Sequence, residues 1–236
     1  MRKIAVVGIG TDVGKTFVSL LLTEQLKADY WKPIQCGVLP ETDADFVRRN
    51  IANSRTVVHP EGFVLQLPAS PHQAAQQEGK LVQVADFKLP HSDNDFMVIE
   101  GAGGILVPLN GKETILDLIE SLNAEVVLVS RFYLGSINHT LLSIQELKHR
   151  KIKLLGIVYN GEDNPATREV IEALTGVKTI ARIPDWSSEL ANSILNTNAS
   201  TNPSPIINSN INPISNSFVK TVDAVKLNNT IVWKNI

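Results

Sequence analysis

The sequence of 236 residues has little of several things that would define particular classes of protein. A single cysteine excludes an internal disulfide framework and does not imply an oxidising compartment. There is no apolar run of roughly 18 residues, which a membrane-spanning helix would need, and the start of the chain does not resemble a secretory signal. The net charge of -2 argues against general nucleic-acid binding, which requires a basic surface. We therefore expect a cytoplasmic protein that binds neither membranes nor nucleic acid.

The sequence has enough apolar residues, 43%, to form one compact core. Short apolar runs alternate along the chain with stretches of helical spacing. We expect strands at residues 3–8, 30–32, 96–100, 125–130, 153–160 and 178–183, and helices at 15–28, 43–53, 70–78, 114–122, 138–150 and 166–175. This alternation predicts an α/β fold, a mostly parallel sheet with helices on both faces.

The composition changes near residue 190. Residues 196–217 consist mainly of Asn, Ser, Thr, Pro and Ile, which favour turns over helices or strands. We expect one domain at residues 1–190 and an Asn/Ser/Pro-rich C-terminal extension at 191–236. Within the extension, residues 218–227 and 230–233 are candidates for short elements that dock back on the domain.

A glycine-rich segment, GIGTDVGKT at residues 8–16, lies between the first predicted strand and the first predicted helix. Glycines allow backbone N–H groups to surround phosphates, and the start of a helix adds partial positive charge. In this context Lys15 would neutralise the β and γ phosphates, and the Thr16 hydroxyl would reach Mg²⁺. The usual spacing requires glycine at position 9, where the chain has Ile9. The segment still predicts a P-loop NTPase-like fold.

Two acidic residues are candidates for holding a nucleotide-bound Mg²⁺, which needs one or two carboxylate ligands. Glu100 ends an apolar strand and precedes a glycine-rich loop at 101–104, so it is expected at the carboxyl edge of the sheet, where ligands bind in such folds. From the sequence alone, Asp43 is a weaker candidate for a Mg²⁺ ligand, because either Thr42 or Asp43 is expected to serve as the N-cap of the helix that follows.

A second lysine, Lys32, also follows a predicted strand. If that strand is the neighbour of the first, Lys32 lies beside the phosphate loop, where a fixed cation suits phosphoryl chemistry. Cys36 follows in the same loop and is expected to line a pocket rather than act as a nucleophile, since no histidine signature accompanies it. The five histidines have no metal-ligand spacing.

Together these segments resemble the dethiobiotin synthetase family. The resemblance covers most of residues 1–184 and rests on motifs that occur in order along the chain: GIGTDVGKT at 8–16, WKPIQCG at 31–37, TDAD at 42–45, PASPH at 68–72, EGAGG at 100–104, LGSINH at 134–139, YNG at 159–161 and IP at 183–184. The early first glycine of the phosphate loop is itself a feature of that family.

The resemblance implies a cyclo-ligase of biotin biosynthesis. It would join CO₂, or bicarbonate as its source, to 7,8-diaminononanoate with consumption of ATP, and release dethiobiotin, ADP and phosphate. An amine would capture CO₂ as a carbamate, the γ-phosphoryl group would convert this into a carbamic-phosphoric anhydride, and the second amine would close the ring. Mg²⁺ and two lysines would spread the developing charge.

The resemblance also implies roles for individual residues. The catalytic set is Lys32, Lys15 and Thr11. The ATP site is Asp12, Val13, Gly14, Lys15, Thr16, Phe17, Asp43, Glu100, Gly101, Ala102, Gly103, Asn160, Gly161 and Pro184, in which Thr16, Asp43 and Glu100 hold Mg²⁺. The substrate site is Cys36, Gly135, Ser136, Ile137 and Asn138, the last four at a helix start that receives the substrate carboxylate across the interface of a homodimer.

The main alternative is a nucleotide switch of the deviant-Walker partitioning type. Such proteins carry a signature lysine early in the phosphate loop, where this chain has Gly10. A glutamine-dependent amidotransferase would need a further domain with a nucleophilic cysteine, for which the chain is too short. A non-catalytic relative is disfavoured because Lys15, Thr16, Lys32 and Glu100 are all present.

Overall fold

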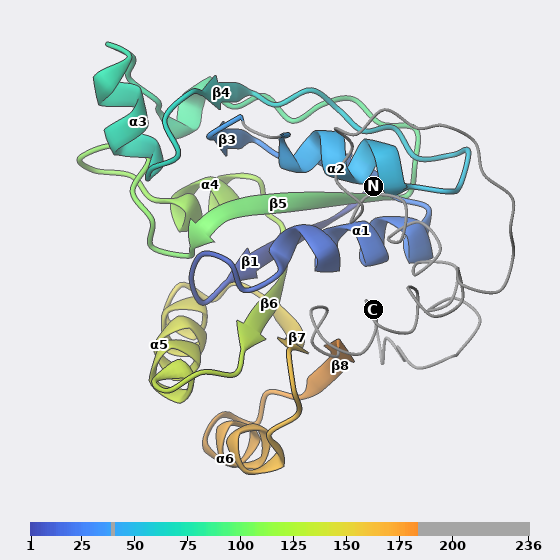
Figure 1. Ribbon diagram of the computed structural model, residues 1–236, viewed down its shortest axis with the longest axis vertical. Helices are drawn as coiled ribbons and strands as arrows, with labels where there is room; N and C mark the ends of the chain where they lie inside the picture. The colour runs from blue at the N-terminus through green and yellow to red at the C-terminus, as the bar shows by residue number, and fades with distance from the viewer. Residues whose placement is uncertain (39–40, 184–236) are drawn as a thin grey trace, which may run out of the picture.

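A computed structural model describes residues 1–38 and 41–183. Its main sheet has six strands in the order β2-β5-β1-β6-β7-β8, and every neighbouring pair is parallel (Figure 1). The strands are β1 (Arg2–Gly8), β2 (Asp29–Trp31), β5 (Phe96–Gly104), β6 (Glu125–Arg131), β7 (Leu154–Asn160) and β8 (Thr179–Ile183). The predicted α/β class with a parallel sheet is confirmed.

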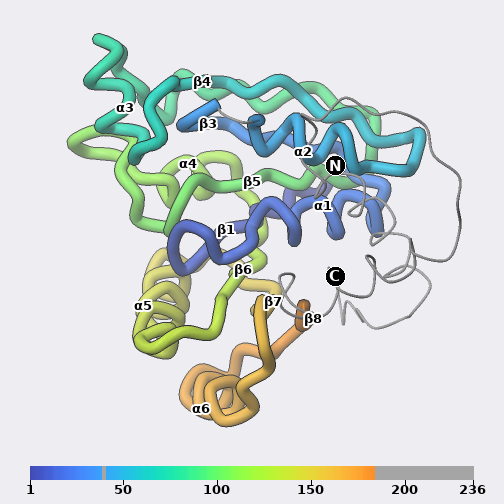
Figure 2. Tube along the Cα trace, viewed as in Figure 1, coloured from blue at the N-terminus to red at the C-terminus, as the bar shows by residue number. Residues whose placement is uncertain are grey.

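The helices lie on both faces of the sheet, as expected. They are α1 (Lys15–Leu26), α2 (Asp43–Asn50), α3 (Pro71–Gln77), α4 (Ile115–Ser121), α5 (Ser136–His149) and α6 (Pro165–Thr175), with a short 3-10 helix, η1 (Val84–Asp86). The chain trace in Figure 2 shows how strands and helices follow one another from β1 to β8. Among the described residues, no helix is long and apolar enough to cross a membrane.

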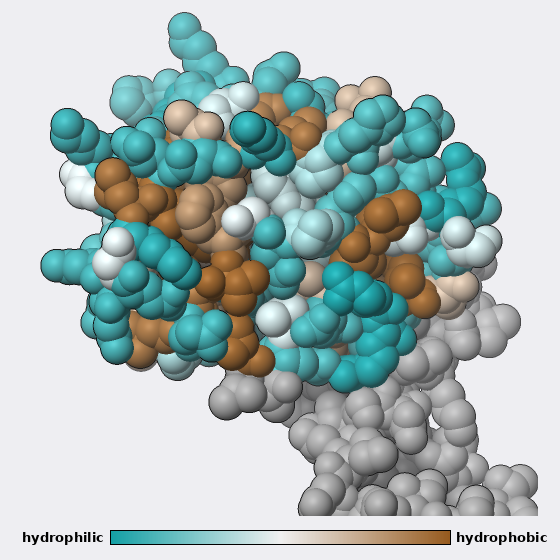
Figure 3. Space-filling view, turned by 90° about the horizontal axis from the view of Figure 1, so that it is seen from above, coloured by the Kyte–Doolittle hydropathy of each residue, from teal (hydrophilic) through white to brown (hydrophobic). Residues whose placement is uncertain are grey.

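Each face of the sheet has its own hydrophobic core. Side chains of a strand alternate between the two faces, so Ile4 and Val6 of β1 pack with α1 and α2, whereas Ala5 and Val7 pack on the side of α4 and α5. All four side chains are buried, and burial of each of the larger ones stabilises the fold by about 1.5–3 kcal/mol. On the face shown in Figure 3, hydrophobic residues lie in patches with hydrophilic residues between them.

The order of the strands corrects one expectation. The premise for placing Lys32 beside the phosphate loop, that the second strand neighbours the first, is wrong, because β5 lies between β2 and β1. The Lys32 side chain nevertheless lines the same pocket as Lys15 and Thr16 of that loop. In the register of the sheet, Trp31 pairs with Ile99, and Val6 of β1 pairs with Glu100. Lys32, one residue beyond Trp31, is therefore placed beside Glu100, and Glu100 stands between Lys32 and the first strand.

Three further expectations differ from the structure. The segment 101–104 is not the expected loop, because β5 continues through it and pairs with β1 at Gly8 and Gly104. Helix α5 starts at Ser136, two residues before the predicted start. Two short strands were not predicted, β3 (Ile34–Cys36) and β4 (Phe63–Leu65), which form a separate parallel pair. With three residues each, they are too short to show a periodic pattern.

Candidate active site

The phosphate loop joins β1 to α1 at the carboxyl edge of the sheet. Gly14 is the N-cap of α1 and has a φ of 93°, a left-handed conformation that suits glycine. Lys15 opens the helix, and its Nζ donates to the carbonyl oxygen of Gly10 at 2.9 Å, closing the loop on itself. This folded-back loop at a helix start is the arrangement that binds phosphate groups.

Residues from two other strands hold the loop in place. The Asn160 side chain, at the end of β7, donates from Nδ2 to the carbonyl oxygen of Val13 at 3.1 Å. Arg131, at the end of β6, donates from Nη1 to the carbonyl oxygen of Asp12 at 3.3 Å. The loop is thus positioned by the same edge of the sheet that carries the other candidate residues.

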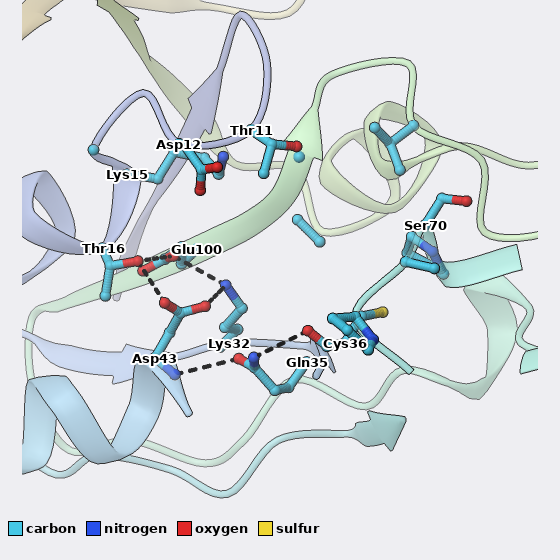
Figure 4. A pocket seen from close by; sticks show the side chains of 17 residues that line it. Thr11, Asp12, Lys15, Thr16, Lys32, Gln35, Cys36, Asp43, Ser70 and Glu100 are labelled. Atoms are coloured by element: carbon cyan, nitrogen blue, oxygen red, sulfur yellow. Dashed lines mark hydrogen bonds and ion pairs between the residues drawn. The ribbon is translucent and has the colours of Figure 1, made fainter. Parts of the chain in front are cut away.

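Four side chains meet beside this loop: Thr16 from α1, Lys32 directly after β2, Glu100 from within β5, and Asp43 from the start of α2 (Figure 4). The Thr16 hydroxyl lies 2.7 Å from Asp43 Oδ1 and 2.8 Å from Glu100 Oε1. The Lys32 ammonium lies 3.0 Å from Glu100 Oε1 and forms a second ion pair with Asp43. Lys32 and Glu100 are almost fully buried. The sequence prediction that Thr16, Lys32, Asp43 and Glu100 share one site is consistent with this geometry.

The structure also separates the two roles open to Asp43. Thr42 is the N-cap of α2: its side chain accepts from the Asp45 N–H at 3.1 Å, and Asp45 accepts from the Thr42 N–H. This reciprocal capping box leaves the Asp43 carboxylate free of any capping role. It therefore points to Thr16 and Lys32 instead.

The charges in this cluster shift one another's pKa values. Burial alone would lower the pKa of Lys32, but the facing carboxylates of Glu100 and Asp43 outweigh it and raise that pKa above its ordinary value. Burial would raise the pKa of Asp43, but Lys32 holds it below its ordinary value. For Lys15, burial prevails and lowers the pKa. Lys32 is consequently a fixed cation at neutral pH, suited to stabilising negative charge and not to accepting a proton.

Beside the charged cluster, a pocket of about 780 Å³ extends toward less polar residues. Figure 4 shows Cys36 and Ser70 at the end of the pocket away from Thr16, with Thr11 and Asp12 on the phosphate loop. Pro68, Pro71 and Val107 add apolar surface. Burial raises the pKa of the Cys36 thiol to about 11, so the thiol is protonated at neutral pH. An elongated ligand with one polar and one aliphatic part fits such a pocket.

Most of the predicted site residues line this pocket, but not all of them. Those that do are Thr11, Asp12, Gly14, Lys15, Thr16, Lys32, Cys36, Asp43, Glu100, Ala102 and Gly103. The other predicted site residues that the structure describes do not line the pocket: Val13, Phe17, Gly101, Gly135, Ser136, Ile137, Asn138, Asn160 and Gly161. Pro184 and the whole extension at 191–236 lie outside the described residues.

Several residues of the site were not predicted. Gln35 and residues 68–71 line the pocket, and both segments belong to motifs already noted in the sequence. The Gln35 side chain accepts from the Asp43 N–H at 3.3 Å and donates to the Gly37 carbonyl at 2.7 Å, so it fixes the start of α2. The Tyr30 hydroxyl donates to Glu100 Oε2 at 2.9 Å. No signal in the sequence indicated Tyr30, since it reads as an ordinary residue of a buried strand.

The oxygen donors of the site fit a hard divalent cation. Thr16, Asp43 and Glu100 place a hydroxyl and two carboxylates together, the donor types that Mg²⁺ prefers. Within the described ranges 1–38 and 41–183, no group of three or more His, Cys, Asp or Glu side chains could hold a metal ion. A Mg²⁺ ion held by one or two carboxylates typically has phosphate oxygens and water as its other ligands.

Comparisons with known proteins show the family of this chain. A family model described as an AAA domain matches residues 2–192. The ATP-dependent dethiobiotin synthetase BioD of Cytophaga hutchinsonii is 47% identical over 183 residues, which are 78% of this chain and 88% of that protein. The enzyme of the same name from Christiangramia forsetii is 49% identical over 180 residues, 76% of this chain and 86% of that protein.

Among solved structures, the cell division ATPase MinD of Pyrococcus furiosus aligns over 96% of this chain and 99% of its own length, with 18% identity and a TM-score of 0.47. The sequence relatives are far more similar, and the family model covers the phosphate loop, Lys32, Asp43 and Glu100. The chain belongs to the AAA-domain family and, within it, to the ATP-dependent dethiobiotin synthetases.

Proposed function

We propose that this protein makes dethiobiotin from 7,8-diaminononanoate, CO₂ and ATP, and releases ADP and phosphate. The observation that carries the proposal is the meeting of Lys15, Thr16, Lys32, Asp43 and Glu100 in one pocket whose other end is less polar. The charged end suits a triphosphate and a carbamate, and the other end suits an aliphatic diamine. The nucleotide-switch alternative is not favoured, because the curated relatives are named ATP-dependent dethiobiotin synthetases and Gly10 supplies no signature lysine.

The proposed reaction begins with a carbamate. One amine of the substrate attacks CO₂, forming an N–C bond and losing a proton. A carbamate oxygen then attacks the γ-phosphorus of ATP, and the bond between that phosphorus and the β,γ-bridging oxygen breaks, which releases ADP. The second amine attacks the carbonyl carbon of the resulting anhydride, forming an N–C bond and losing a proton. The C–O bond breaks, phosphate leaves with that oxygen, and the cyclic urea is complete.

The lysines of the site would act by stabilising negative charge on the phosphates and the carbamate. Lys15 would neutralise the phosphates, and Lys32, a permanent cation, would stabilise the charge that develops on the carbamate during phosphoryl transfer. Thr11 lines the pocket on the phosphate loop and would contact the transferring group. Thr16, Asp43 and Glu100 would hold Mg²⁺. When bound, this ion would supply further charge neutralisation at the phosphates.

The remaining predicted residues are assigned to the edges of the same site. Asn160 and Gly161 would contact the adenine, with Pro184 beside it, and Val13, Phe17, Gly101, Ala102 and Gly103 would surround the nucleotide. Cys36 would contact the diamine through its backbone.

Residues 1–190 would form the catalytic domain. Removal of the chain after Leu195 should leave most of the activity. Complete loss of activity in a folded truncation would make the extension part of the catalytic unit.

We further propose that two copies of the chain form a homodimer with sites at the interface. Gly135, Ser136, Ile137 and Asn138 lie at the start of α5, apart from the pocket lining of their own chain. Beside them, the Leu134 side chain is fully exposed and Tyr133 is 43% exposed, which favours contact with a partner. Light scattering should give a dimer mass, and Leu134→Asp should weaken dimerisation; a monomeric active protein would contradict this part of the proposal.

The experiment that tests the function uses ¹³C-labelled bicarbonate. The purified protein is incubated with Mg-ATP, 7,8-diaminononanoate and the label, and the product is identified by mass spectrometry. We expect a cyclic urea carrying one ¹³C atom, together with one ADP per product. ADP release at the same rate without the diamine would instead support a nucleotide switch.

A further inference from the structure

Tyr30 places a phenol in the interior of the protein, directly against the charged cluster. Its side chain is fully buried in β2, and its hydroxyl donates to Glu100 Oε2 at 2.9 Å. Glu100 is itself 1% exposed, so water has little access to replace this bond. A buried carboxylate oxygen that loses its partner is costly, so the bond constrains how the carboxylate sits.

The two oxygens of Glu100 have separate partners. Oε1 faces the Thr16 hydroxyl at 2.8 Å and the Lys32 ammonium at 3.0 Å, on the side of the pocket. Oε2 faces Tyr30, on the side of the core. The Tyr30 bond therefore fixes the rotation of the carboxylate and keeps Oε1 directed at the pocket.

We propose that Tyr30 is a positioning residue of the divalent-cation site, which holds the Glu100 carboxylate in the orientation that presents one oxygen to the metal. The inference rests on the proposed function in one respect, that Glu100 is a ligand of a nucleotide-bound cation. Residues that orient metal ligands typically change metal affinity about 10–100-fold when they are altered.

The chain contains a matched control for this role. Tyr159 is also buried, but its hydroxyl has no hydrogen-bond partner among the described residues, and its ring stacks on Phe132. Tyr30→Phe and Tyr159→Phe thus remove the same buried hydroxyl group. Only the first removal takes a hydrogen bond from Glu100.

The test measures Mn²⁺ binding to the full-length protein with saturating ADP, by electron paramagnetic resonance. We expect Tyr30→Phe to weaken Mn²⁺ binding about tenfold, and Tyr159→Phe to leave it unchanged. The double variant Tyr30→Phe with Glu100→Gln should bind no more weakly than Glu100→Gln alone, because Tyr30 acts through the carboxylate. Equal Mn²⁺ affinity in Tyr30→Phe and unaltered protein, or full additivity in the double variant, would overturn the proposal.

A second measurement needs no substitution at Tyr30, so it decides the question even if Tyr30→Phe does not fold. The chain has three tyrosines, so incorporation of 3-fluorotyrosine gives three ¹⁹F resonances, which Tyr133→Phe and Tyr159→Phe assign. Adding Mg²⁺ to the ADP complex should shift the Tyr30 resonance more than the Tyr159 resonance; no shift at Tyr30 would overturn the proposal. Cyclic-urea formation is scored separately, so its absence would refute the proposed function while the Mn²⁺ and ¹⁹F results still decide the role of Tyr30.

Discussion

Lys32 Nζ lies 3.0 Å from Glu100 Oε1, and both side chains are buried, Lys32 directly after β2 and Glu100 within the adjacent strand β5. A buried ion pair of this kind costs desolvation on both sides, so it is weak evidence for stability. Because the ion pair lies beside the phosphate loop, we assign it a chemical role and not a stabilising one. In the proposed function, the pair places a cation and a carboxylate where the nucleotide and the second substrate would meet.

Replacement of Lys32 should act on turnover more than on nucleotide binding. Lys32→Met should lower kcat by at least about 10²-fold while ATP still binds, because the lost charge matters most in the transition state. Lys112→Met, at an exposed position, serves as the control. Steady-state kinetics and a fluorescent-nucleotide binding assay separate the two effects. Unchanged kcat in Lys32→Met would remove this residue from the mechanism.

Replacement of the two aspartates of α2, Asp43 and Asp45, should have different effects on the Mg²⁺ requirement and on stability. Asp43 faces Thr16 and Lys32, whereas Asp45 belongs to the capping box with Thr42. Asp43→Asn should therefore raise the Mg²⁺ concentration needed for half-maximal activity. Asp45→Asn should leave that concentration unchanged and lower the free energy of unfolding by about 0.3–1.5 kcal/mol. The same Mg²⁺ requirement in both variants would argue against Asp43 as a ligand.

The phosphate loop leaves no room for a side chain at Gly14. A Cβ there would lie 2.0 Å from Asn160 Nδ2, and the φ of 93° is strained for any other residue. Gly14→Ala should therefore displace Asn160 and greatly weaken ATP binding, measured by isothermal titration calorimetry. At Gly111 an added Cβ meets nothing within 4 Å, so Gly111→Ala should bind ATP normally. Normal binding by both variants would show that the loop tolerates repacking.

The single cysteine should react slowly. Because burial raises the pKa of Cys36 to about 11, little thiolate is present at pH 7, and alkylation by iodoacetamide should be slower than that of a free cysteine. The rate should keep rising as the pH passes 9, the region in which a free thiol is already ionised. Mass spectrometry follows one site only, since the chain has one cysteine. A rate that levels off near pH 9 would contradict the assigned environment.

A second buried carboxylate, Asp29, should make stability depend on pH. Burial alone would raise the pKa of Asp29, but hydrogen bonds from Ser92, the Val57 N–H and Asn94 together hold it below its ordinary value. A lowered pKa means that the folded state favours the ionised carboxylate. The stability it contributes is present above the unfolded-state pKa of about 3.9 and is lost as the pH falls through the folded value.

The measurement is the urea-induced unfolding free energy at several pH values. The difference between unaltered protein and Asp29→Asn should be largest near pH 6 and should shrink below about pH 4. Asp93→Asn, in which the replaced side chain is fully exposed, is the matched control and should show no such trend. A difference for Asp29→Asn that is constant with pH would contradict the assignment.

The sequence indicated the fold because its signals are local. The apolar runs predicted all six strands of the main sheet, and GIGTDVGKT predicted the helix start that now carries Gly14 and Lys15. The order of the strands is not local, and this is why the position of β5 between β2 and β1 was missed. The contact between Lys32 and Glu100 is a result of that order.

The site was predictable where chemistry marks a residue and hidden where it does not. Glu100 stands out as a charge at the end of an apolar strand, but Tyr30 fits a buried strand whether or not its hydroxyl has a partner. Asp43 could be read as a cap until the structure gave that role to Thr42. Such choices depend on which side chains face each other across 70 or so residues of sequence, as in the Tyr30–Glu100 contact, which no local pattern records.

The central claim is that ATP activates a captured CO₂ by phosphorylating its carbamate beside Lys15 and Lys32. The most direct measurement uses ¹⁸O-labelled bicarbonate in a short incubation with Mg-ATP and 7,8-diaminononanoate, and follows the label into inorganic phosphate by mass spectrometry. Because the carbamate oxygen leaves with the phosphoryl group, we predict one ¹⁸O atom in the phosphate released with each dethiobiotin. Phosphate free of ¹⁸O, formed while dethiobiotin accumulates, would mean that the γ-phosphoryl group passes to water and that no carbamic-phosphoric anhydride forms.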